Sequence, residues 1–516
     1  MRNKLFLIIF ILAGYAASAG ENLRIFESEQ MNSRVLGQKV SYSVLLPDGY
    51  AQGEKHYPVV YLLHGLGDDE TSWLEYGRIT QAVDELVKAG QIEPMIYVMP
   101  MGYRTYYVND YKGEFPYEDM FVNEFVPHID SVYRTLKKAD QRALVGYSMG
   151  GFGAFSLHLR HPELFGAAVP LSMSVRTDAQ YMSEDANGWN TQWGRLFGGE
   201  GMTGEDRITT YYRAHSPFHV FERMTEKRKQ AVNLLMFNGD EEETLCRSNE
   251  ELHILMHRLG VPHNYRVLDG GHSFHVWREA LPEALIFIND FMQKLIVKQE
   301  ALAMVKDEDQ NQNTLQLQLA GYGVEVVLPA DYHLGNRKYP LILFASFSHE
   351  GRLVATKAVH AQVQSNQAPP AVLLFLSSGE LQHLDSILPA AGAALRLREG
   401  ARMRAIAVSG AEAPLAMRQS LEMGFSSCLL FHGCWNNLEE LKELLKPGEW
   451  KGNDVRVFQI AADRGSDVEG NGNLHILLRE QSNRHEYRVH AGNDKDTAAA
   501  STLEEALQFI LNRFHR

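Results

Sequence analysis

Short apolar runs alternate with helical stretches along the first half of the chain. Five of these runs are typical of buried strands, at 59–63, 95–99, 143–145, 167–171 and 233–237. Helical patterns separate them, for instance at 79–88, 124–136 and 247–259. Parallel strands need crossover helices of this kind, and both faces of their sheet are covered. The alternation therefore predicts an α/β fold with a mostly parallel sheet flanked by helices.

Part of this pattern occurs twice. Residues 42–67 align with residues 324–349 without gaps, at a constant offset of 282, the difference between 324 and 42. The identical positions include Leu46, Pro47, Tyr50, Tyr57 and Pro58, which recur as Leu328, Pro329, Tyr332, Tyr339 and Pro340. A second block, 252–255, recurs at 474–477 with an offset of 222, because the second copy is shorter, chiefly opposite residues 172–223. Repeats in register predict a tandem duplication of one α/β unit.

The length of the chain agrees with two domains. Its 516 residues exceed what a single hydrophobic core usually supports. Together with the repeat, this length predicts one domain over 20–297 and a second over 298–516. The polar segment 306–313 resembles a linker at first, but its place at the start of the repeat predicts a hairpin.

The first residues have the layout of a secretory signal peptide. Arg2 and Lys4 precede the apolar run 5–12, and small residues follow up to Ala19. The run is too short to span a membrane, and no second long apolar run follows it. We therefore expect residues 1–19 to be removed after Ala19 and the protein to be exported, to the periplasm or beyond the cell.

Composition narrows the classes of partner. The formal net charge is −14 and the sequence pI is about 5.8, so no basic field attracts nucleic acid or anionic lipid. Three cysteines are too few for a disulfide scaffold in a chain of this length, and no zinc-ligand spacing is present. We expect no nucleic-acid partner, no membrane span and no metal.

A candidate nucleophile lies between a predicted strand and a predicted helix. Gly146-Tyr-Ser148-Met-Gly150 follows the strand 143–145 and opens a helix at 152–160. This is the context that a Gly-x-Ser-x-Gly turn requires, because the two glycines allow the sharp bend that exposes the serine oxygen. We predict Ser148 as the nucleophile of an α/β-hydrolase fold.

The chain order of such folds places the base last and the acid before it. His272 lies in a glycine-containing loop after the strand 264–268, and we predict it as the general base. The acid belongs after the strand 233–237, where four consecutive carboxylates, at 240–243, leave the choice open. For the oxyanion hole we expect the backbone N–H groups of Met149 and Leu66.

These segments together resemble the putative-esterase (esterase D-like) group, which includes the feruloyl and acetylxylan esterases of carbohydrate esterase family 1. The matching segments are His64–Gly67 with Thr71-Ser72-Trp73, Val145–Ala154, and Gly260–Arg266 leading to Gly270–Phe274. The resemblance covers roughly residues 35–296 and implies hydrolysis of carboxylic esters through an acyl-enzyme without a cofactor. It implies acetyl or feruloyl groups on plant-type carbohydrate as the substrate class.

In this group the acid precedes a Leu by two residues and an Asn by six. Leu245 and Asn249 thus indicate Glu243, whereas counting forward from Gly239 indicates Glu242. We choose Glu243 and keep Glu242 as the alternative.

Four tryptophans are candidates for contact with the substrate. Trp189 and Trp193 lie in the stretch 172–223, where such folds carry cap insertions. With Trp73 and Trp277 they could stack on a sugar or phenolic ring, although at least two of the four are expected to be packing residues. We choose Trp73 and Trp277 as substrate-binding residues.

The second copy lacks every predicted catalytic group. In the alignment, Gly410 replaces Ser148, Asp494 replaces His272 and Gly465 stands opposite Glu243. The glycine loop after the first parallel strand becomes Ser346-Phe-Ser-His349. We predict a degenerate, catalytically inactive hydrolase-like domain over 298–516, with a scaffolding, dimer-like packing or substrate-positioning role.

Other functions share parts of these patterns. Mycolyl-transferring acyltransferases resemble the same fold and motif set, and a non-catalytic carbohydrate-binding protein would retain the fold alone. S-Formylglutathione hydrolases are similar too, but the signal peptide argues against an intracellular thioester hydrolase. The set of Ser148, His272 and an acid in the first copy favours the esterase.

Overall fold

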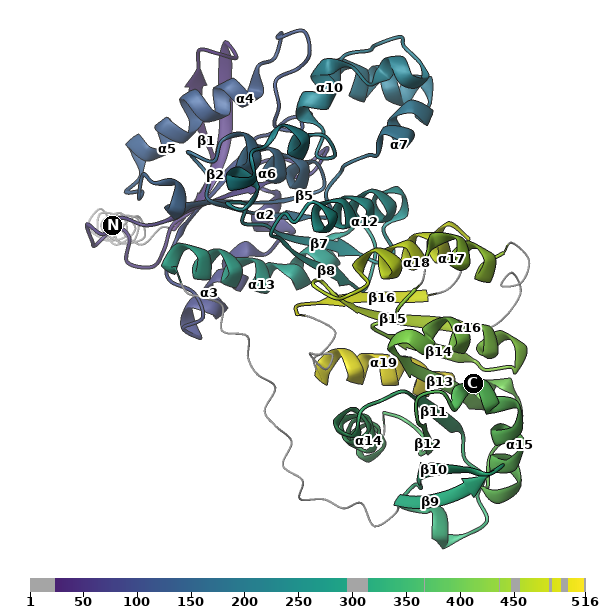
Figure 1. The fold of residues 1–516 in the computed structure, drawn as a ribbon. Coiled ribbons are helices and arrows are strands. Elements are labelled where there is room, and N and C mark those ends of the chain that lie inside the picture. The colour runs from purple at the N-terminus through teal and green to yellow at the C-terminus, as the bar shows by residue number, and fades with distance from the viewer. Residues whose placement is uncertain are drawn as a thin grey trace, which may run out of the picture. The chain divides into compact units, whose positions relative to one another are not determined.

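The computed structural model describes residues 24–294, 314–365, 367–435, 437–446, 455–481, 485–492 and 500–514. The predicted signal peptide and the polar segment 306–313 lie outside these ranges. The chain forms two compact units, one of 1–263 with 270–297 and the other of 264–269 with 298–516 (Figure 1).

The first unit is built on a mostly parallel sheet. Its strands are β1 (Ile25–Ser33), β2 (Gln38–Leu45), β3 (Val59–Leu63), β4 (Ile96–Pro100), β5 (Arg142–Tyr147), β6 (Ala167–Leu171) and β7 (Leu235–Gly239). They lie in the order β1-β2-β4-β3-β5-β6-β7. Only β1 and β2 run antiparallel to their neighbours. Every residue of β3 to β7 is buried, as expected for parallel strands covered on both faces.

Helices cover this sheet. They are α2 (Ser72–Glu75), α3 (Ile79–Lys88), α4 (Tyr117–Met120), η1 (Phe121–Phe125), α5 (Val126–Val132), η2 (Ala139–Gln141), α6 (Met149–Arg160), α12 (Glu243–Arg258) and α13 (Phe274–Gln293). Both α6 and α13 pack against β5 and β6. The strands 59–63, 167–171 and 264–268 and the helix 79–88 occur at the predicted residues. The strands predicted at 95–99, 143–145 and 233–237 differ by one or two residues at each end.

One predicted helix ends early. The pattern at 124–136 predicts a continuous helix, but α5 ends at Val132 and Tyr133 is extended. The next residues bond to a distant segment instead, because the N–H of Leu136 donates to the carbonyl of Tyr57 at 2.8 Å and the N–H of Tyr57 donates to Arg134 at 2.9 Å. Pairing with this segment replaces the last helical turn.

Residues 172–223 form a cap of short helices. These are α7 (Asp178–Ser183), α8 (Ala186–Gly188), η3 (Trp189–Trp193), α9 (Gly194–Phe197), η4 (Gly204–Arg207), α10 (Thr210–His215) and η5 (Val220–Arg223), followed by α11 (Glu226–Lys229). Figure 1 shows α7 and α10 grouped together at one end of the first unit. The side chains of Thr177, Asp185 and Thr209 accept hydrogen bonds from the first turns, which explains where three of these helices begin.

The second unit has the same order of strands. They are β9 (Thr314–Leu319), β10 (Tyr322–Val327), β11 (Leu341–Ala345), β12 (Val372–Leu376), β13 (Arg404–Ser409), β14 (Ser427–Phe431), β15 (Arg456–Ala462) and β16 (His485–His490). Their order is β9-β10-β12-β11-β13-β14-β15-β16, with β9 and β10 antiparallel and the others parallel. The contacts of β8 (Asn264–Leu268) group it with this unit, where it pairs antiparallel with β16.

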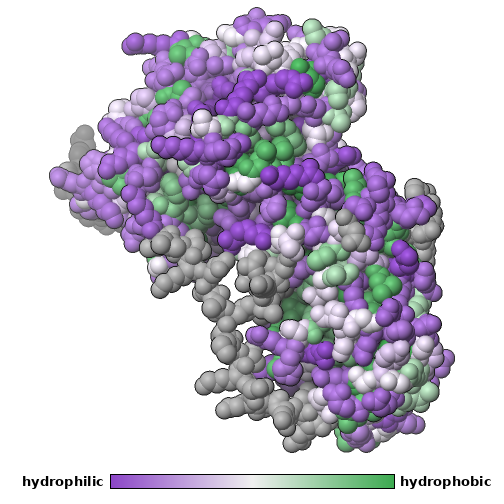
Figure 2. All heavy atoms as spheres, viewed as in Figure 1, coloured by the Kyte–Doolittle hydropathy of each residue, from purple (hydrophilic) through white to green (hydrophobic). Residues whose placement is uncertain are grey.

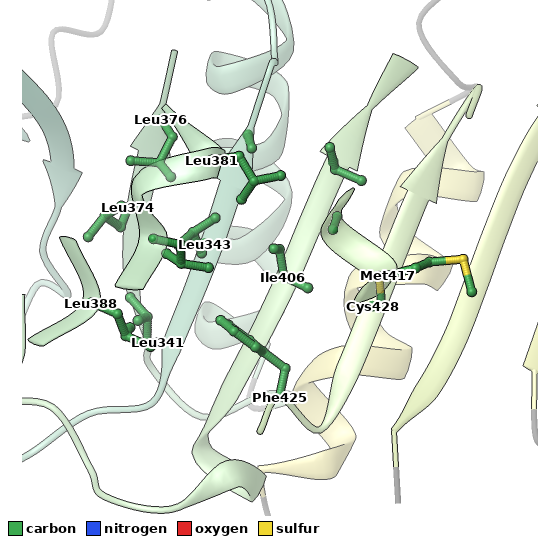
Figure 3. Packing of buried hydrophobic residues seen from close by; sticks show 14 of the residues in the cluster. Leu341, Leu343, Leu374, Leu376, Leu381, Leu388, Ile406, Met417, Phe425 and Cys428 are labelled. Atoms are coloured by element: carbon green, nitrogen blue, oxygen red, sulfur yellow. The ribbon is translucent and has the colours of Figure 1, made fainter. Parts of the chain in front are cut away.

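Side chains of the second unit alternate between two cores. Leu341, Leu343 and Ile406 belong to one core (Figure 3), and Ile342 and Phe344 belong to the other. Successive residues of a strand point to opposite faces, so a sheet covered on both sides buries both sets. The helices are η6 (Tyr332–Leu334), α14 (His349–Gln364), η7 (Leu381–His383), α15 (Leu384–Ala394), η8 (Ala401–Met403), η9 (Gly410–Glu412), α16 (Ala413–Glu422), α17 (Leu438–Leu444), α18 (Val468–Glu480) and α19 (Ala500–Arg513). Helices α15 to α18 cover the first core, and α14 and α19 cover the second.

The surface seen in Figure 2 is mostly hydrophilic, with small hydrophobic patches between polar side chains. Among the residues that the structure describes, no helix combines the length and the apolar character needed to cross a bilayer.

Candidate active site

The predicted nucleophile lies at a sharp turn between β5 and α6. Ser148 has φ 56° and ψ −117°, a left-handed conformation that residues with a Cβ rarely adopt. Glycine is required on both sides of Ser148, because other backbone atoms lie where a Cβ of residue 146 or 150 would be. A Cβ on Gly146 would lie 2.1 Å from the carbonyl oxygen of Gly150, and a Cβ on Gly150 would lie 2.2 Å from that of Leu63. The turn therefore tolerates a side chain at Ser148 and none at either glycine.

His272 lies beside this serine. Its Nε2 is 2.9 Å from Ser148 Oγ, within hydrogen-bond distance. The imidazole side chain is 38% exposed, and one edge of the ring packs against Trp277 with the centroids 5.1 Å apart. The structure thus brings together the serine and the histidine that the sequence predicts as nucleophile and base.

The carboxylate next to His272 belongs to Glu242. Its Oε2 lies 2.7 Å from His272 Nδ1, and its side chain is fully buried. The choice of Glu243 is wrong, because that residue is the first of α12 and is exposed. Glu242 is the extended residue just before the helix, so its side chain turns inward while the next one points to solvent. Counting forward from Gly239 gives the residue whose carboxylate faces His272.

Backbone contacts join the loops that carry the acid and the base. The N–H of Glu241 donates to the carbonyl of Gly270 at 2.9 Å, and the N–H of Gly270 donates to the carboxylate of Asp240 at 3.0 Å. A Cβ on Gly239 would lie 2.1 Å from the carbonyl oxygen of Gly270. Of the four consecutive carboxylates, Asp240 therefore braces the loops and Glu242 faces the imidazole.

The two predicted oxyanion donors lie on backbone next to Ser148. Met149 opens α6, where N–H groups have no acceptor inside the helix. Leu66 follows Gly65, and a Cβ on Gly65 would meet the ring of Tyr147 at 2.6 Å and Ser148 Cβ at 3.4 Å. This close packing of the Gly65 backbone brings the loop of Leu66 to the nucleophile.

His64 contacts two backbone segments beside the nucleophile turn. The N–H of Gly102 donates to its Nε2 at 2.7 Å, so the ring proton is on Nδ1, 2.8 Å from the carbonyl oxygen of Gly65. Burial lowers the pKa of this imidazole, which agrees with a neutral ring. His64 thereby joins the loop of Leu66 to the segment that follows β4.

Comparison with known proteins agrees with this geometry. A model of the family described as Putative esterase matches residues 33–288, which include the nucleophile turn, both loops of the triad and the cap. Residues 33–288 belong to the Putative esterase family.

Relatives of this esterase-family domain include carbohydrate-processing enzymes. An endo-1,4-beta-xylanase/feruloyl esterase of Xylanibacter ruminicola is 37% identical over 145 residues, 26% of this chain and 19% of the relative. An esterase of Mycobacterium tuberculosis is 26% identical over 300 residues, 52% of this chain and 61% of the relative. The chain thus spans less than two thirds of the length of these relatives. A solved ferulic acid esterase, 29% identical, covers 52% of this chain and 98% of its own with a TM-score of 0.43.

The tryptophans of the esterase-family domain pack inside it, which corrects the choice of Trp73 and Trp277 as substrate-binding residues. Trp73 is 1% exposed and its Nε1 donates to the carbonyl of Leu63 at 3.2 Å. Trp277 is 5% exposed and its Nε1 donates to Ser172 Oγ at 2.9 Å. Its indole stacks on Tyr147 with the centroids 4.3 Å apart. With the indole N–H groups and ring faces engaged inside the domain, both residues support the site without facing a substrate.

The cap tryptophans are buried as well. Trp189 is 0% and Trp193 3% exposed, and Trp189 Nε1 donates to the carbonyl of Gly199 at 2.7 Å. Their rings pack against other aromatic side chains of the cap, such as Tyr181.

The sequence motifs did not identify the tyrosine-rich loop after β4. Tyr103, Tyr106 and Tyr107 all have positive φ, at 51°, 54° and 58°. Tyr107 Oη donates to the carbonyl of His64 at 3.1 Å, and Tyr106 Oη lies 3.1 Å from Ser174 Oγ. Since the N–H of Ser174 donates to the carbonyl of Ser148 at 3.0 Å, the loop is tied to both sides of the nucleophile. The only signal in the sequence is the cluster of aromatic residues itself.

The helix that starts at Ser148 contains a buried histidine, and this makes stability depend on pH. The N–H of Asn233 donates to His158 Nε2 at 3.3 Å, and His158 Nδ1 donates to the carbonyl of Phe165 at 3.0 Å, so the ring is neutral. Burial lowers the pKa of His158 to about 4 from 6.5, and that of His215 in the cap to about 4 as well.

A folded-state pKa below the unfolded value means that the unfolded chain binds more protons between the two. The contribution of these two histidines to the free energy of unfolding is fully present above pH 6.5. It falls as the pH is lowered towards 4, by up to ~1.4 kcal/mol per pH unit for each histidine. We expect the Tm from calorimetry to decrease steadily over this range, and by less in His158→Gln. A Tm that is constant or rises on acidification would contradict the prediction.

Proposed function

We propose that this chain is an exported serine esterase that hydrolyses carboxylic esters by an acyl-enzyme route. The observation that carries the proposal is the continuous contact from Ser148 Oγ through the ring of His272 to Glu242, with distances of 2.9 and 2.7 Å. Nucleophile, base and orienting carboxylate stand in the order and geometry of a hydrolase triad. The family of residues 33–288 supports the same reaction class.

In the proposed mechanism His272 Nε2 takes the proton of Ser148 Oγ as this oxygen attacks the ester carbonyl carbon. The N–H groups of Leu66 and Met149 bind the oxyanion of the tetrahedral intermediate. When the intermediate collapses, His272 returns the proton to the leaving alcohol. His272 Nε2 then takes a proton from water, whose oxygen attacks the acyl carbon. The acyl–Oγ bond breaks, and His272 returns the proton to Ser148 Oγ as the acid leaves. Glu242 stabilises the imidazolium that forms in each half of the reaction. No cofactor takes part in these steps.

As substrates we propose acetyl or feruloyl esters of carbohydrate. The names of two similar proteins, a xylanase/feruloyl esterase and a ferulic acid esterase, support this class. The composition of residues 1–19 supports export, which would bring the enzyme to a polysaccharide outside the cell.

For residues 298–516 we propose a degenerate copy of the esterase domain without catalytic activity. The equal order of strands in the two units supports a duplication. So does a shared contact: the guanidinium of Arg134 lies 3.7 Å from the ring centre of Tyr50, and that of Arg396 lies 4.0 Å from Tyr332. The same residues also share a hydrogen bond, from the backbone N–H of each arginine to the tyrosine hydroxyl, at 2.8 and 2.9 Å.

A pair of neighbouring histidines recurs as well. His253 Nδ1 lies 2.7 Å from His263 Nε2, and His475 Nδ1 lies 2.8 Å from His485 Nε2. Each histidine of the second pair lies 222 residues after its counterpart in the first, since 475 − 253 and 485 − 263 both give 222. The same offset relates the second block of the repeat. A contact retained where the catalytic residues are lost belongs to the fold and not to the reaction.

The position aligned with Ser148 has a positive φ like that of Ser148, but no side chain that could act as a nucleophile. Gly410 has φ 72°, close to the 56° of Ser148, but carries no side chain. The nearby carboxylate of Glu412 accepts hydrogen bonds from Ser346 Oγ and, at 2.7 Å, from the N–H of Gly379. The position aligned with His272, Asp494, lies outside the described residues.

Covalent labelling tests the proposed function directly. We expect a fluorophosphonate to form one adduct, on Ser148, in the full chain without its first 19 residues, because the neighbouring imidazole activates only this hydroxyl. Mass spectrometry of peptides locates the adduct. An unmodified Ser148 would refute the esterase, and an adduct within 298–516 would refute the inactive copy. Hydrolysis of acetylated xylan and methyl ferulate then distinguishes the acyl groups.

A further inference from the structure

A cleft of about 700 Å³ opens beside the oxyanion loop. One wall is formed by Gly67 and Asp68, the end of that loop, and another by Arg195 of the cap helix α9. His272 does not line the cleft. The cleft therefore lies on the oxyanion-loop side of the nucleophile, where it can receive a part of the substrate remote from the scissile bond.

Two cations and one carboxylate line the cleft. Arg195 Nη2 donates to the carbonyl oxygen of Arg104 at 2.9 Å, which keeps the two arginines together. Asp68 accepts a hydrogen bond from Tyr147 Oη at 2.7 Å, so its carboxylate is held against the nucleophile strand. Across the described parts of the chain, neither arginine forms an ion pair with an acidic side chain. The chain as a whole has a net charge of −14, whereas the lining of this cleft contains two arginines and one carboxylate.

The loop that carries Arg104 is held in a strained conformation. Arg104 follows Tyr103 and precedes Tyr106 and Tyr107, which share positive φ values. Such residues persist only where the surroundings hold them, and they cluster at sites of function. Here the anchor is His64, which accepts from the N–H of Gly102 at 2.7 Å. The backbone of Arg104 is thus positioned relative to the oxyanion loop before any ligand binds.

Aromatic side chains complete the cleft. Tyr103 and Phe115 meet edge to face with the centroids 5.3 Å apart, and both line the cleft. A half-buried tyrosine beside the exposed Arg104 and the half-buried Arg195 is suited to a sugar ring that carries a charged group.

We propose that this cleft recognises a carboxylate on the ester substrate, held by Arg104 and Arg195. The substrate class is then an acidic ester, either an acylated uronic-acid saccharide or an ester of a dicarboxylic acid. This inference rests on the proposed esterase function and adds a preference for charge to it. Guanidinium groups form planar, charge-assisted hydrogen bonds with a carboxylate, which a neutral sugar hydroxyl cannot match.

The test uses matched pairs of esters that differ only in charge. The acyl arm compares para-nitrophenyl hydrogen adipate with para-nitrophenyl hexanoate, and the alcohol arm compares methyl O-acetyl-glucuronoside with methyl O-acetyl-glucoside. The variants are Arg104→Gln, Arg195→Gln and the double variant. Arg213→Gln is the control, because that arginine is exposed on α10 and does not line the cleft.

In one arm we expect each single substitution to raise KM for the acidic ester about 10-fold, since a hydrogen bond to a charged group is lost, with little change in kcat. The neutral esters should keep their kcat/KM in all variants, and the wild-type preference for the acidic ester should weaken at high salt. The arm that responds shows which half of the ester carries the carboxylate.

Equal losses on the acidic and neutral esters, or no loss on the acidic ester of either arm, would overturn the inference. Fluorophosphonate labelling of Ser148 in each variant separates this result from a misfolded protein. Hydrolysis of both the acidic and the neutral esters that does not depend on either arginine would leave the esterase function intact and remove only the preference for charge.

Discussion

Replacement of Ser148 by alanine is expected to lower kcat for ester hydrolysis by about 10⁶-fold, as removal of a triad serine does elsewhere. In the proposed mechanism this hydroxyl attacks the carbonyl carbon, and its oxygen lies 2.9 Å from His272 Nε2. The oxyanion donors are backbone groups and remain in the variant, so a small residual rate above that of water is expected. Steady-state hydrolysis of para-nitrophenyl acetate measures the loss.

Ser156→Ala is the matched control for this substitution. Ser156 is also a buried serine of the region around α6, 5% exposed, but it lies two turns further along the helix. We expect loss of the Ser156 hydroxyl to leave kcat within about twofold. A substitution away from the reacting atoms affects the free energy of unfolding more than the rate of the reaction. Comparable Tm values for the two variants would show that loss of activity in Ser148→Ala is chemical. Substantial hydrolysis by Ser148→Ala would require a different nucleophile.

Glu242→Gln is expected to reduce kcat by about 10⁴-fold, whereas Glu243→Gln should leave it within about twofold. The carboxylate of Glu242 accepts the Nδ1 proton of His272 at 2.7 Å and thereby directs the lone pair of Nε2 towards Ser148. An amide at this position can donate to Nδ1 instead, which turns the ring into the wrong tautomer. Glu243 is exposed at the start of α12 and does not reach the imidazole. Hydrolysis rates of the two variants at neutral pH give the comparison.

The neighbouring glutamates form a control within one chain, since both substitutions remove one negative charge from the same loop. Glu242→Asp should retain more activity than Glu242→Gln, because the shorter carboxylate still accepts the Nδ1 proton through a longer contact. A severe loss in Glu243→Gln with full activity in Glu242→Gln would contradict the geometry of the site.

Much of the first unit follows from local sequence. Runs such as 59–63 and 167–171 are apolar at every position, and only a strand buried on both faces of a sheet accommodates such a run. The nucleophile turn also follows from local sequence, because glycine stands at 146 and 150, the two positions where a Cβ would clash with the backbone. Ser148 and His272 could therefore be named before the fold was known.

Other features depend on contacts between segments that are distant in the chain. Trp73 and Trp277 are large aromatic residues near the motifs, and the sequence alone does not distinguish a ring that faces a ligand from one that is buried against Leu63 or Tyr147. Likewise the tyrosine-rich loop acquires its role only because His64 lies beneath it. These assignments require the positions of both partners.

By itself the sequence determined the alternation of strands and helices, the order of serine, acid and base along the chain, and the repeat that relates the two halves. The periodicity of apolar residues and the positions of the glycines reflect steric constraints between residues that are close in the sequence. Only the tertiary structure decided between Glu242 and Glu243, since the choice depends on which carboxylate points inward where α12 begins. It also placed Arg104 beside Arg195, which lie 91 residues apart in the chain and meet only when the cap folds over the sheet.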